Sequence, residues 1–181
     1  MTEGANDSLS VVRRRTVVLC ADVVGYCRLM ARDDARTVAA IVSIRSGIGA
    51  LARLYDGRLV DAVGDNLLIE FCNEKKAVYC AISIQRALWH FNRACPSEHH
   101  IQLRIGLHSG DVLDAGGALY GSTVNISARL QAIAEPGAIC LSLEVAEKLD
   151  ERLRKACVFV GPTALKNIPD PVRTAHLALP V

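Results

Sequence analysis

The apolar residues of the chain follow two different periods, and the change from one to the other predicts alternating strands and helices. Residues Thr16 to Asp22 form a continuous β-branched and apolar run, which is typical of a buried central strand. Further on, apolar residues recur every three or four positions, which predicts a helix that begins at Asp33 or Asp34 and ends at Asp56-Gly57. The same period predicts a second helix over Val78 to Phe91.

Two pairs of short strand-like runs lie on either side of the second helix. The runs 58–63 and 67–71 are joined by Gly64-Asp65-Asn66, which favours a tight hairpin because such a turn needs residues that tolerate positive φ. The runs 101–108 and 112–114 predict another hairpin, which turns at Ser109-Gly110-Asp111. Beyond them we expect a helix over 123–134, a strand over 138–142, a short helix over 144–154, and closing strands over 158–160 and 173–179.

This order of elements, β-α-β-β-α-β and then β-α-β-α-β, resembles a ferredoxin-like core with a C-terminal extension. We therefore expect an α+β fold with one mixed or antiparallel sheet and with helices packed on one face. A length of 181 residues fits one domain. We place this domain at residues 13–181, after a flexible tail at residues 1–12.

Composition narrows the function classes. Lys and Arg number 21 against 19 Asp and Glu, and a formal net charge of +2 argues against a dedicated nucleic-acid binder. Hydrophobic residues make up 51% of the chain, enough for a substantial core, and the 4% of aromatic residues disfavours a sheet that stacks RNA bases. No uninterrupted apolar run reaches the roughly 18 residues of a membrane span, and the first residues lack the apolar segment of a secretory signal. We expect a cytoplasmic protein with neither nucleic acid nor membrane as a partner.

Two further sets of residues are expected to have no chemical role. The seven cysteines contain no C-x-x-C pair and are expected to stay reduced, as small apolar residues where they are buried. Arg13, Arg14 and Arg15 are expected to form a solvated edge before the first strand.

Two aspartates are candidates for binding a metal. Asp22 ends the first strand, and Asp65 lies at the tip of the first hairpin. In a ferredoxin-like core the first strand lies beside that hairpin, so both carboxylates can meet at one end of the sheet. Two carboxylates, completed by water and substrate phosphates, are a ligand set that suits Mg²⁺. The same pattern also fits a turn-forming Asp65 and a helix-capping Asp22.

A second candidate group lies between Gly121 and Arg129. Asn125 and Arg129 are four residues apart and share one helix face, and the glycine-rich turn before them allows a ligand to approach closely. An amide and a guanidinium together suit a polarised or anionic oxygen, such as a phosphate oxygen. A solvent-facing pair on an amphipathic helix fits the same spacing.

Four sequence blocks resemble, in order, those of the class III adenylate and guanylate cyclase catalytic domain. They are VVLCADVVGYCRLM, LVDAVGDNLLIEF, LRIGLHSGDV and LYGSTVNISARL, and the resemblance extends from about Arg15 to Leu179. It implies a phosphorus–oxygen lyase that converts a purine nucleoside triphosphate into a 3′,5′-cyclic nucleotide and pyrophosphate, in cyclic nucleotide signalling. It also implies a head-to-tail homodimer with shared active sites.

The resemblance extends to the metal site. Asp22 and Asp65 correspond to the two metal-binding aspartates of the family, with two Mg²⁺ or Mn²⁺ ions at each site. Val23 follows Asp22 at a position where the family uses backbone groups for metal and phosphate. In the implied mechanism the ribose 3′-oxygen attacks the α-phosphorus, and pyrophosphate leaves.

On the substrate side, Asn125 corresponds to the asparagine that orients the ribose, Arg129 to the arginine that stabilises the transition state, and Lys166 to the lysine that holds the triphosphate. Two positions depart from the family. Adenylate cyclases have a lysine where this chain has Asp61, and an aspartate or threonine where it has Ala118. Guanylate cyclases carry a glutamate at the first position, which is an acceptor like Asp61. Two hypotheses follow: a cyclase of uncertain base preference, or a degenerate nucleotide-binding or dimerisation module with little or no catalysis.

Overall fold

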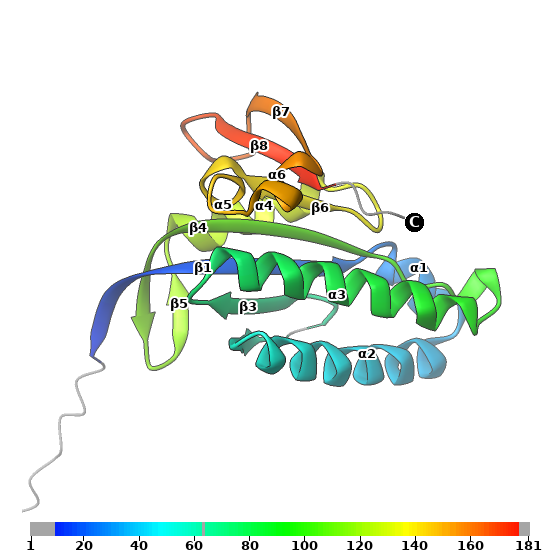
Figure 1. Cartoon of the computed structure of the whole chain (residues 1–181). Helices are drawn as coiled ribbons and strands as arrows, with labels where there is room; N and C mark the ends of the chain where they lie inside the picture. Colours follow the sequence, from blue (N-terminus) through cyan, green and yellow to red (C-terminus); the bar gives the residue numbers. More distant parts are fainter. Residues whose placement is uncertain (1–9, 63, 178–181) are drawn as a thin grey trace, which may run out of the picture.

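Two long antiparallel strands form the centre of the fold (Figure 1). β1 (Val11–Val23) and β4 (Leu103–Ala115) are each 13 residues long and pair along their whole length. Val17, Val18 and Leu19 of β1 are at most 2% exposed, which confirms the prediction of a buried central strand. The computed structural model describes residues 10–62 and 64–177.

Within these described residues, six further strands complete a single eight-stranded sheet. They are β2 (Gly57–Asp61), β3 (Leu67–Phe71), β5 (Ala118–Tyr120), β6 (Ile139–Ser142), β7 (Cys157–Thr163) and β8 (Val172–Leu177). The strand order is β2-β3-β1-β4-β6-β8-β7, and β5 pairs with β4. β4 and β6 are parallel, whereas the other neighbours are antiparallel. The expected α+β class with one mixed sheet is confirmed.

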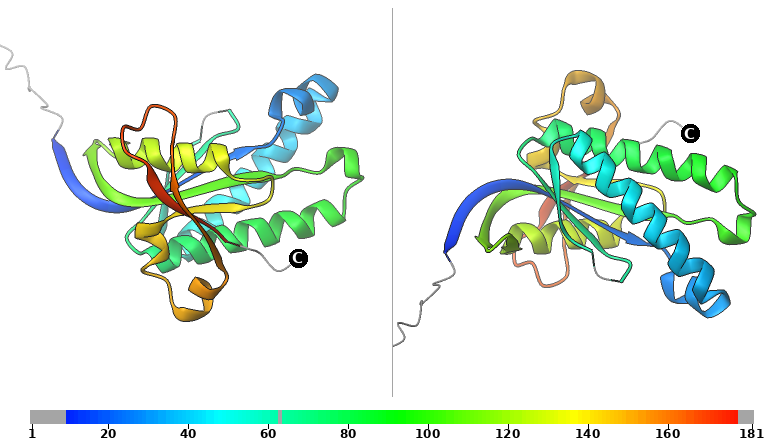
Figure 2. Two further views of the ribbon diagram at one scale, coloured as in Figure 1. Left: turned by 90° about the horizontal axis from the view of Figure 1, so that it is seen from above. Right: turned by 90° about the horizontal axis from the view of Figure 1, so that it is seen from below.

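The two long helices, α2 (Asp34–Leu54) and α3 (Glu74–Arg93), cover the same face of the sheet (Figure 2). Asp33 caps α2 and Asn73 caps α3, each through a side-chain oxygen that accepts a backbone N–H three residues further on. Both helices were expected from their apolar period, and both contribute side chains to the main core cluster. They form one layer on the strands.

α4 (Ser122–Ile133) lies on the opposite face, which corrects the expectation that the helices pack on one face. Its Ala128 packs against Val18 and Cys20 of β1. Because side chains alternate along a strand, the apolar run of β1 presents apolar residues on both faces, and the residues next to Val18 face the long helices. An uninterrupted apolar strand therefore needs a cover on each side, and α4 provides the second one.

The backbone of α4 rests directly on the central strands. The hydroxyl of Ser127 is fully buried and lies 2.9 Å from the carbonyl oxygens of both Val18 and Gly106, to either of which it can donate. A Cβ atom at Gly106 would lie 2.3 Å from the carbonyl oxygen of Ser127 and 2.2 Å from the amide nitrogen of Gln131. The glycine is therefore required for this close approach.

We expect Gly106→Ala to lower the free energy of unfolding by about 1–3 kcal/mol or more, because α4 must move away from β4 to make room for the methyl group. Gly47→Ala is the matched control, since a Cβ at this helical position meets nothing within 4 Å. It should raise the free energy of unfolding by about 0.5–1 kcal/mol. Urea unfolding followed by circular dichroism measures both. Equal stabilities for the two variants would contradict the close packing of α4.

The expected hairpin at Ser109-Gly110-Asp111 is wrong, because these residues continue β4 and pair with residues 15–17 of β1. Gly110 is needed for a different reason. A Cβ atom there would lie 2.6 Å from Oγ1 of Thr123 on α4. A glycine is needed at position 110 because α4 packs closely against β4 there, and not because the chain turns.

Other boundaries differ by smaller amounts. β1 begins at Val11, inside the segment expected to be a tail, and residues 1–9 lie outside the described part. The expected helix over 144–154 is two short helices, α5 (Leu143–Ala146) and α6 (Glu151–Lys155). Position 63 and positions 178–179 of the expected strands also lie outside the described residues. The remaining elements are α1 (Tyr26–Arg32) and the 3₁₀ helix η1 (Ser97–His99).

α2 is the one helix in the described part of the chain that is long and apolar enough to cross a membrane, judged by length and mean hydropathy. The sequence shows no uninterrupted apolar run there because Arg45 divides the segment. One side of α2 belongs to the core, since Ile41, Ile48 and Ala52 are at most 6% exposed.

All seven cysteines are free, as expected. Burial raises the pKa of Cys20 to about 11 and the pKa values of Cys80 and Cys140 to about 12. These thiols therefore stay protonated near neutral pH and serve as packing residues.

Candidate active site

Asp22 lies near the end of β1, where it pairs in register with Arg104 of β4. The guanidinium of Arg104 donates from Nε to Oδ1 of Asp22 over 3.0 Å and from Nη2 to Oδ2 over 2.5 Å. The two side chains are 31% and 14% exposed, respectively. This two-bond ion pair fixes the Asp22 carboxylate at one end of the sheet.

Asp65 lies in the connection between β2 and β3. The turn depends on Gly64, whose φ of +59° favours glycine. The pKa of Arg104 is raised, first by its hydrogen bonds to Asp22 and further by the charges of Asp22 and Asp65, while burial acts in the opposite direction. Ala21, next to Asp22, pairs in register with Leu67, two residues after Asp65, so the fold brings the two candidate metal ligands to the same end of the sheet.

The donor set at this end fits a hard divalent cation. Carboxylate oxygens are the ligands that Mg²⁺ and Mn²⁺ prefer, and both oxygens of Asp22 accept from the guanidinium of Arg104 in this structure. The side chain of Val23 is buried, so this residue can offer only a backbone group. Among residues 10–62 and 64–177, no three His, Cys, Asp or Glu side chains are grouped so as to hold a metal. A metal at Asp22 and Asp65 would thus need further oxygen atoms from backbone, water or substrate.

A second group of candidate residues meets at α4. Arg129 donates from Nε to the backbone carbonyl oxygen of Lys166 over 3.1 Å. Lys166 lies in the loop between β7 and β8, which is held by buried Leu165 in a cluster with Leu130 of α4. Asn125 is exposed one helical turn before Arg129. Two cationic side chains and an amide are therefore available at one surface, a combination that suits a triphosphate.

The two positions that depart from the family lie on neighbouring elements. Asp61 ends β2 and Ala118 begins β5, and Arg58 of β2 joins them by donating to the carbonyl oxygen of Gly117 over 2.9 Å. Both Asp61 and Ala118 are exposed. One oxygen of Asp61 accepts the backbone N–H of Ala62 over 2.7 Å, which holds its carboxylate at the strand end.

Arg104 is a site residue that the sequence reasoning missed. In the sequence it is a charged residue between Leu103 and Ile105, as in any strand with one solvated face. The informative signal is the register of β1 and β4, which sets Arg104 directly opposite Asp22. That register becomes apparent only once the two strands are known to pair along their whole length.

Comparisons with known proteins identify the family of this chain. Residues 13–174 match the family model for the adenylate and guanylate cyclase catalytic domain. The chain is 35% identical over 164 residues to a putative adenylate cyclase 3 of Rhizobium meliloti, which covers 90% of this chain and 28% of that protein. It is 31% identical over 146 residues to an adenylate cyclase of Streptomyces coelicolor, which covers 80% of this chain and 37% of that protein. The chain thus spans about a third of the length of these relatives.

Solved structures show the same fold. An adenylate/guanylate cyclase/hydrolase from Silicibacter pomeroyi is 34% identical and superposes with a TM-score of 0.87, covering 95% of this chain and all of that one. An adenylyl cyclase from P. aeruginosa is 18% identical and has a TM-score of 0.82 over 94% of this chain and 96% of its own. Since the family model covers nearly the whole described chain and the fold agrees, this chain belongs to the adenylate and guanylate cyclase catalytic domain family.

Proposed function

We propose that this domain converts a purine nucleoside triphosphate into a 3′,5′-cyclic nucleotide and pyrophosphate. The observation that carries the proposal is that Asp22 and Asp65 lie next to two paired residues, Ala21 of β1 and Leu67 of β3, at one end of the sheet. Family membership supports it, and so does the second group of polar and cationic residues on and beside α4. In the reaction, the bond from the ribose 3′-oxygen to the α-phosphorus forms while the bond from that phosphorus to pyrophosphate breaks.

Asp22 and Asp65 are proposed to hold two Mg²⁺ or Mn²⁺ ions, with a backbone group of Val23 as a further ligand. The bound ions would lower the pKa of the 3′-hydroxyl and neutralise charge on the phosphates. Arg104 orients the Asp22 carboxylate through its two hydrogen bonds.

The residues on and beside α4 are proposed to act on the substrate. Asn125 orients the ribose, Arg129 stabilises the negative charge of the transition state, and Lys166 binds the triphosphate. The hydrogen bond from Arg129 to the backbone carbonyl of Lys166 supports a joint role, since it holds the loop that carries Lys166 against the side chain of Arg129.

We also propose that the domain acts as a head-to-tail homodimer with two equivalent sites. Each site would take Asp22 and Asp65 from one chain and Asn125 and Arg129 from the other. The exposure of Asn125 supports this, because an exposed amide on α4 is free to contact a second chain or a substrate held by it. Twofold symmetry then provides both sites with the same set of residues.

The alternative, a degenerate nucleotide-binding or dimerisation module, rests on Asp61 and Ala118 alone. It is not favoured, because the residues that correspond to the metal and phosphate ligands of the family are all present in the chain. A lost contact to a base edge costs about 1–3 kcal/mol, which weakens binding more than it affects the chemistry. The deciding assay is purified protein with Mg²⁺ or Mn²⁺ and each of the four nucleoside triphosphates, scored for cyclic product. Absence of product from all four would support the module.

We expect a modest preference for GTP over ATP. Asp61 as a carboxylate accepts hydrogen bonds, and guanine presents two donors at the edge where adenine presents the N1 acceptor. Ala118 has no polar group with which to discriminate. Asp61→Lys combined with Ala118→Asp should shift the ratio of the two kcat/KM values toward ATP, with Ala118→Asp alone as the control. Efficient cyclisation of ATP and none of GTP by the wild type would contradict the argument from Asp61.

A further inference from the structure

The outer edge of β4 has a gap between its two strand partners. β6 pairs with β4 over Ile105–Leu107, and β5 pairs with it over Leu113–Ala115. Residues 108–112 have β1 on one side and, in the part of the chain that the structure describes, no strand on the other. A polar cavity of about 540 Å³ opens along this gap, and we refer to it as the β4-edge cavity.

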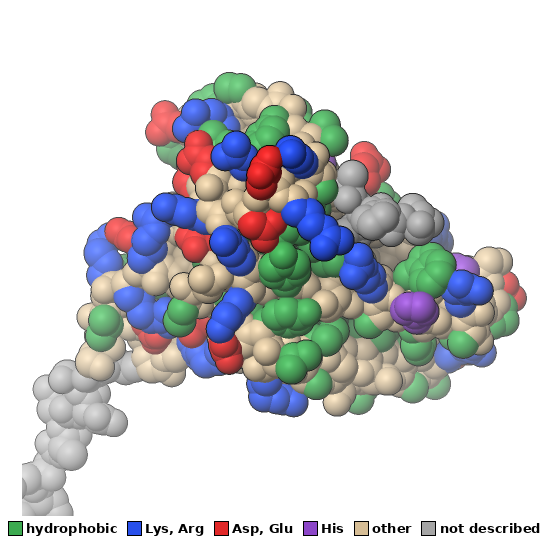
Figure 3. Space-filling model, in the orientation of Figure 1, with side chains coloured by type: hydrophobic (Ala, Val, Ile, Leu, Met, Phe, Trp, Pro, Cys, Tyr) green, Lys and Arg blue, Asp and Glu red, His purple; other side chains and the backbone are tan. Residues whose placement is uncertain are grey.

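The three adjacent arginines of β1 divide between two environments. Arg14 donates to Glu70 over 2.6 Å and to Asp114 over 2.7 Å, in a half-buried ion network. Arg13 and Arg15 alternate with it along the strand and line the β4-edge cavity. Figure 3 shows Lys and Arg side chains at the end of the molecule where β1 begins. The expectation of a solvated edge is therefore wrong for Arg14, which is ion-paired. Arg13 and Arg15 are exposed as expected, but they also line the cavity.

Arg13 and Arg15 take no part in the ion pairs of Arg14 with Glu70 and Asp114. Both are exposed, and neither has a carboxylate oxygen within 4.0 Å among the described residues. Asp111, opposite Arg15 in the strand register, is the single carboxylate among the residues that line the cavity. Two guanidiniums against one carboxylate leave the cavity positively charged.

Across the edge of β4 from the two arginines, the first turn of α4 also lines the cavity. Its N-cap is Gly121, which provides no side-chain cap, and the first turn holds no acidic residue. The N–H groups of Ser122 and Thr123 therefore add to the positive potential. His108 also lines the cavity and is only 8% exposed. Its Nδ1 is bonded to the hydroxyl of Ser142 over 2.8 Å, while its Nε2 has no hydrogen-bond partner among the described residues and lies on the side of Gly110, at the cavity.

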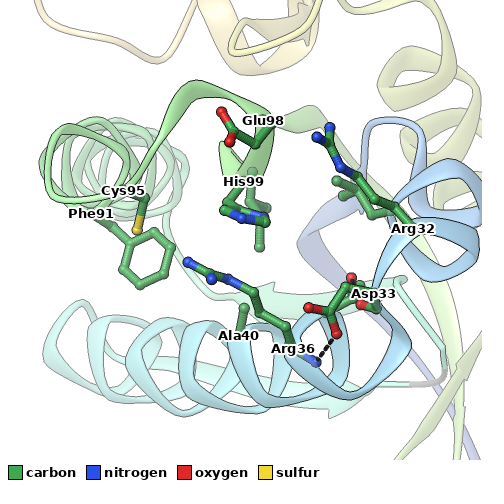
Figure 4. A pocket seen from close by; sticks show the side chains of 11 residues that line it. Arg32, Asp33, Arg36, Ala40, Phe91, Cys95, Glu98 and His99 are labelled. Atoms are coloured by element: carbon green, nitrogen blue, oxygen red, sulfur yellow. Dashed lines mark hydrogen bonds between the residues drawn. The ribbon is translucent and has the colours of Figure 1, made fainter.

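In a smaller pocket beside α1 and η1, carboxylates balance the positive charge of the arginines that line it. It has a volume of about 70 Å³, and Arg32 and Arg36 line it together with Asp33 and Glu98 (Figure 4). The charge of Arg32 contributes to lowering the pKa of Glu98, after the larger effects of a backbone hydrogen bond and of His99. Positive and negative groups balance there, whereas in the β4-edge cavity they do not.

We propose that the β4-edge cavity binds the phosphate group of a small phosphate monoester, held by Arg13, Arg15 and the first turn of α4. Guanidinium groups and helix N-termini are the two groups that proteins commonly present to phosphate. The volume of the cavity lies in the range of small-molecule sites, which leaves room for an organic part beside the phosphate. The exposed ring of Tyr120 lines the cavity and offers it an apolar surface.

The arginines of this site lie apart from the metal pair of their own chain, since Arg15 and Asp22 are seven residues apart on the same strand, which corresponds to about 23 Å. The first turn of α4 also adjoins Asn125 and Arg129 of the proposed substrate site, so Arg13 and Arg15 are the residues that distinguish the two sites. Binding at the β4-edge cavity requires neither carboxylate of the metal pair. It can therefore be measured in the presence of a chelator, where the proposed cyclase site cannot hold its metals.

Isothermal titration calorimetry with ribose 5-phosphate and with inorganic phosphate, in chelator at constant ionic strength, tests the proposal. Arg13→Gln combined with Arg15→Gln should weaken the binding of both ligands by about tenfold or more. The matched control, Arg152→Gln combined with Arg154→Gln, removes the same charge from exposed positions on α6 and should leave binding unchanged. Ribose 5-phosphate should bind more tightly than inorganic phosphate.

Ser122→Pro is a second variant that keeps both arginines. It removes one N–H from the first position of α4, where proline is tolerated, and should weaken phosphate binding while the melting temperature stays near that of the wild type. Equal, weak binding by the wild type and all variants would mean an adventitious ion only and would overturn the proposal. Equal affinity for ribose 5-phosphate and inorganic phosphate would contradict the proposal that the site also contacts the organic part of the ligand.

Discussion

Asp22→Asn and Asp65→Asn should each reduce the rate of cyclic nucleotide formation by about a hundredfold or more, with the protein still folded cooperatively. Each substitution removes one of the two negative charges proposed to hold the divalent ions, while asparagine keeps nearly the same shape. Asp65→Asn should leave stability near that of the wild type, whereas Asp22→Asn also loses the ion pair with Arg104 and should lower the free energy of unfolding by about 1–3 kcal/mol. Rates with the preferred nucleoside triphosphate and thermal melting by circular dichroism measure the two effects.

Asp56→Asn is the control for this pair. Asp56 is exposed in the turn after α2, has a φ of +56°, and forms a surface ion pair with Lys76. Asparagine tolerates this conformation, so the variant removes the same charge at little structural cost. Its turnover should match that of the wild type. If Asp22→Asn or Asp65→Asn behaved like Asp56→Asn, the proposed metal site would be wrong.

Mixing two inactive variants should restore activity if the sites are shared between chains. With random exchange of Asp65→Ala and Arg129→Ala chains, half of the dimers are mixed, and each mixed dimer has one intact site out of two. The expected activity is therefore about one quarter of the wild-type value per chain. The assay is cyclic nucleotide formation after co-incubation, compared with each variant alone.

A mixture of Asp22→Ala and Asp65→Ala chains provides the control. Both changes lie in the same half of the proposed site, so no mixed dimer contains an intact site and no activity should return. Recovery in this mixture, or none in the mixture with Arg129→Ala, would show that the sites are not composed as proposed. Both outcomes are independent of which base the enzyme prefers.

The sequence predicted the elements whose packing is decided locally. The apolar period identified α2 and α3, and the apolar run identified β1, because each of these patterns reflects burial of that segment alone. It failed at Gly110, which in a single sequence has the appearance of a turn residue. In the structure a glycine is needed at this position because Thr123 of α4 packs against it. This contact joins segments that are distant in the sequence, so no local pattern contains it.

The candidate site shows the same division. Asp22 and Asp65 stand out in the sequence because each is a carboxylate next to an apolar strand. Arg104 does not, because a charged residue in an alternating strand is ordinary, and its importance arises from the register that sets it against Asp22. Strand ends can therefore be predicted as candidate sites from one sequence, whereas the partner that orients a side chain requires the strand pairing.

The close packing of α4 on the sheet limits how this helix can move relative to the strands. The hydroxyl of Ser127 bonds the helix to the central strands. The backbone of α4 fills the space where a side chain of residue 106 would lie, so the helix has no room to slide. Rotation of α4 by itself would break a fully buried hydrogen bond, so the helix is expected to move together with the sheet on the microsecond and slower timescales of collective motion. In the proposed homodimer, an opening or closing that brings Asn125 and Arg129 toward a substrate would then be a rigid-body displacement of one whole subunit against the other.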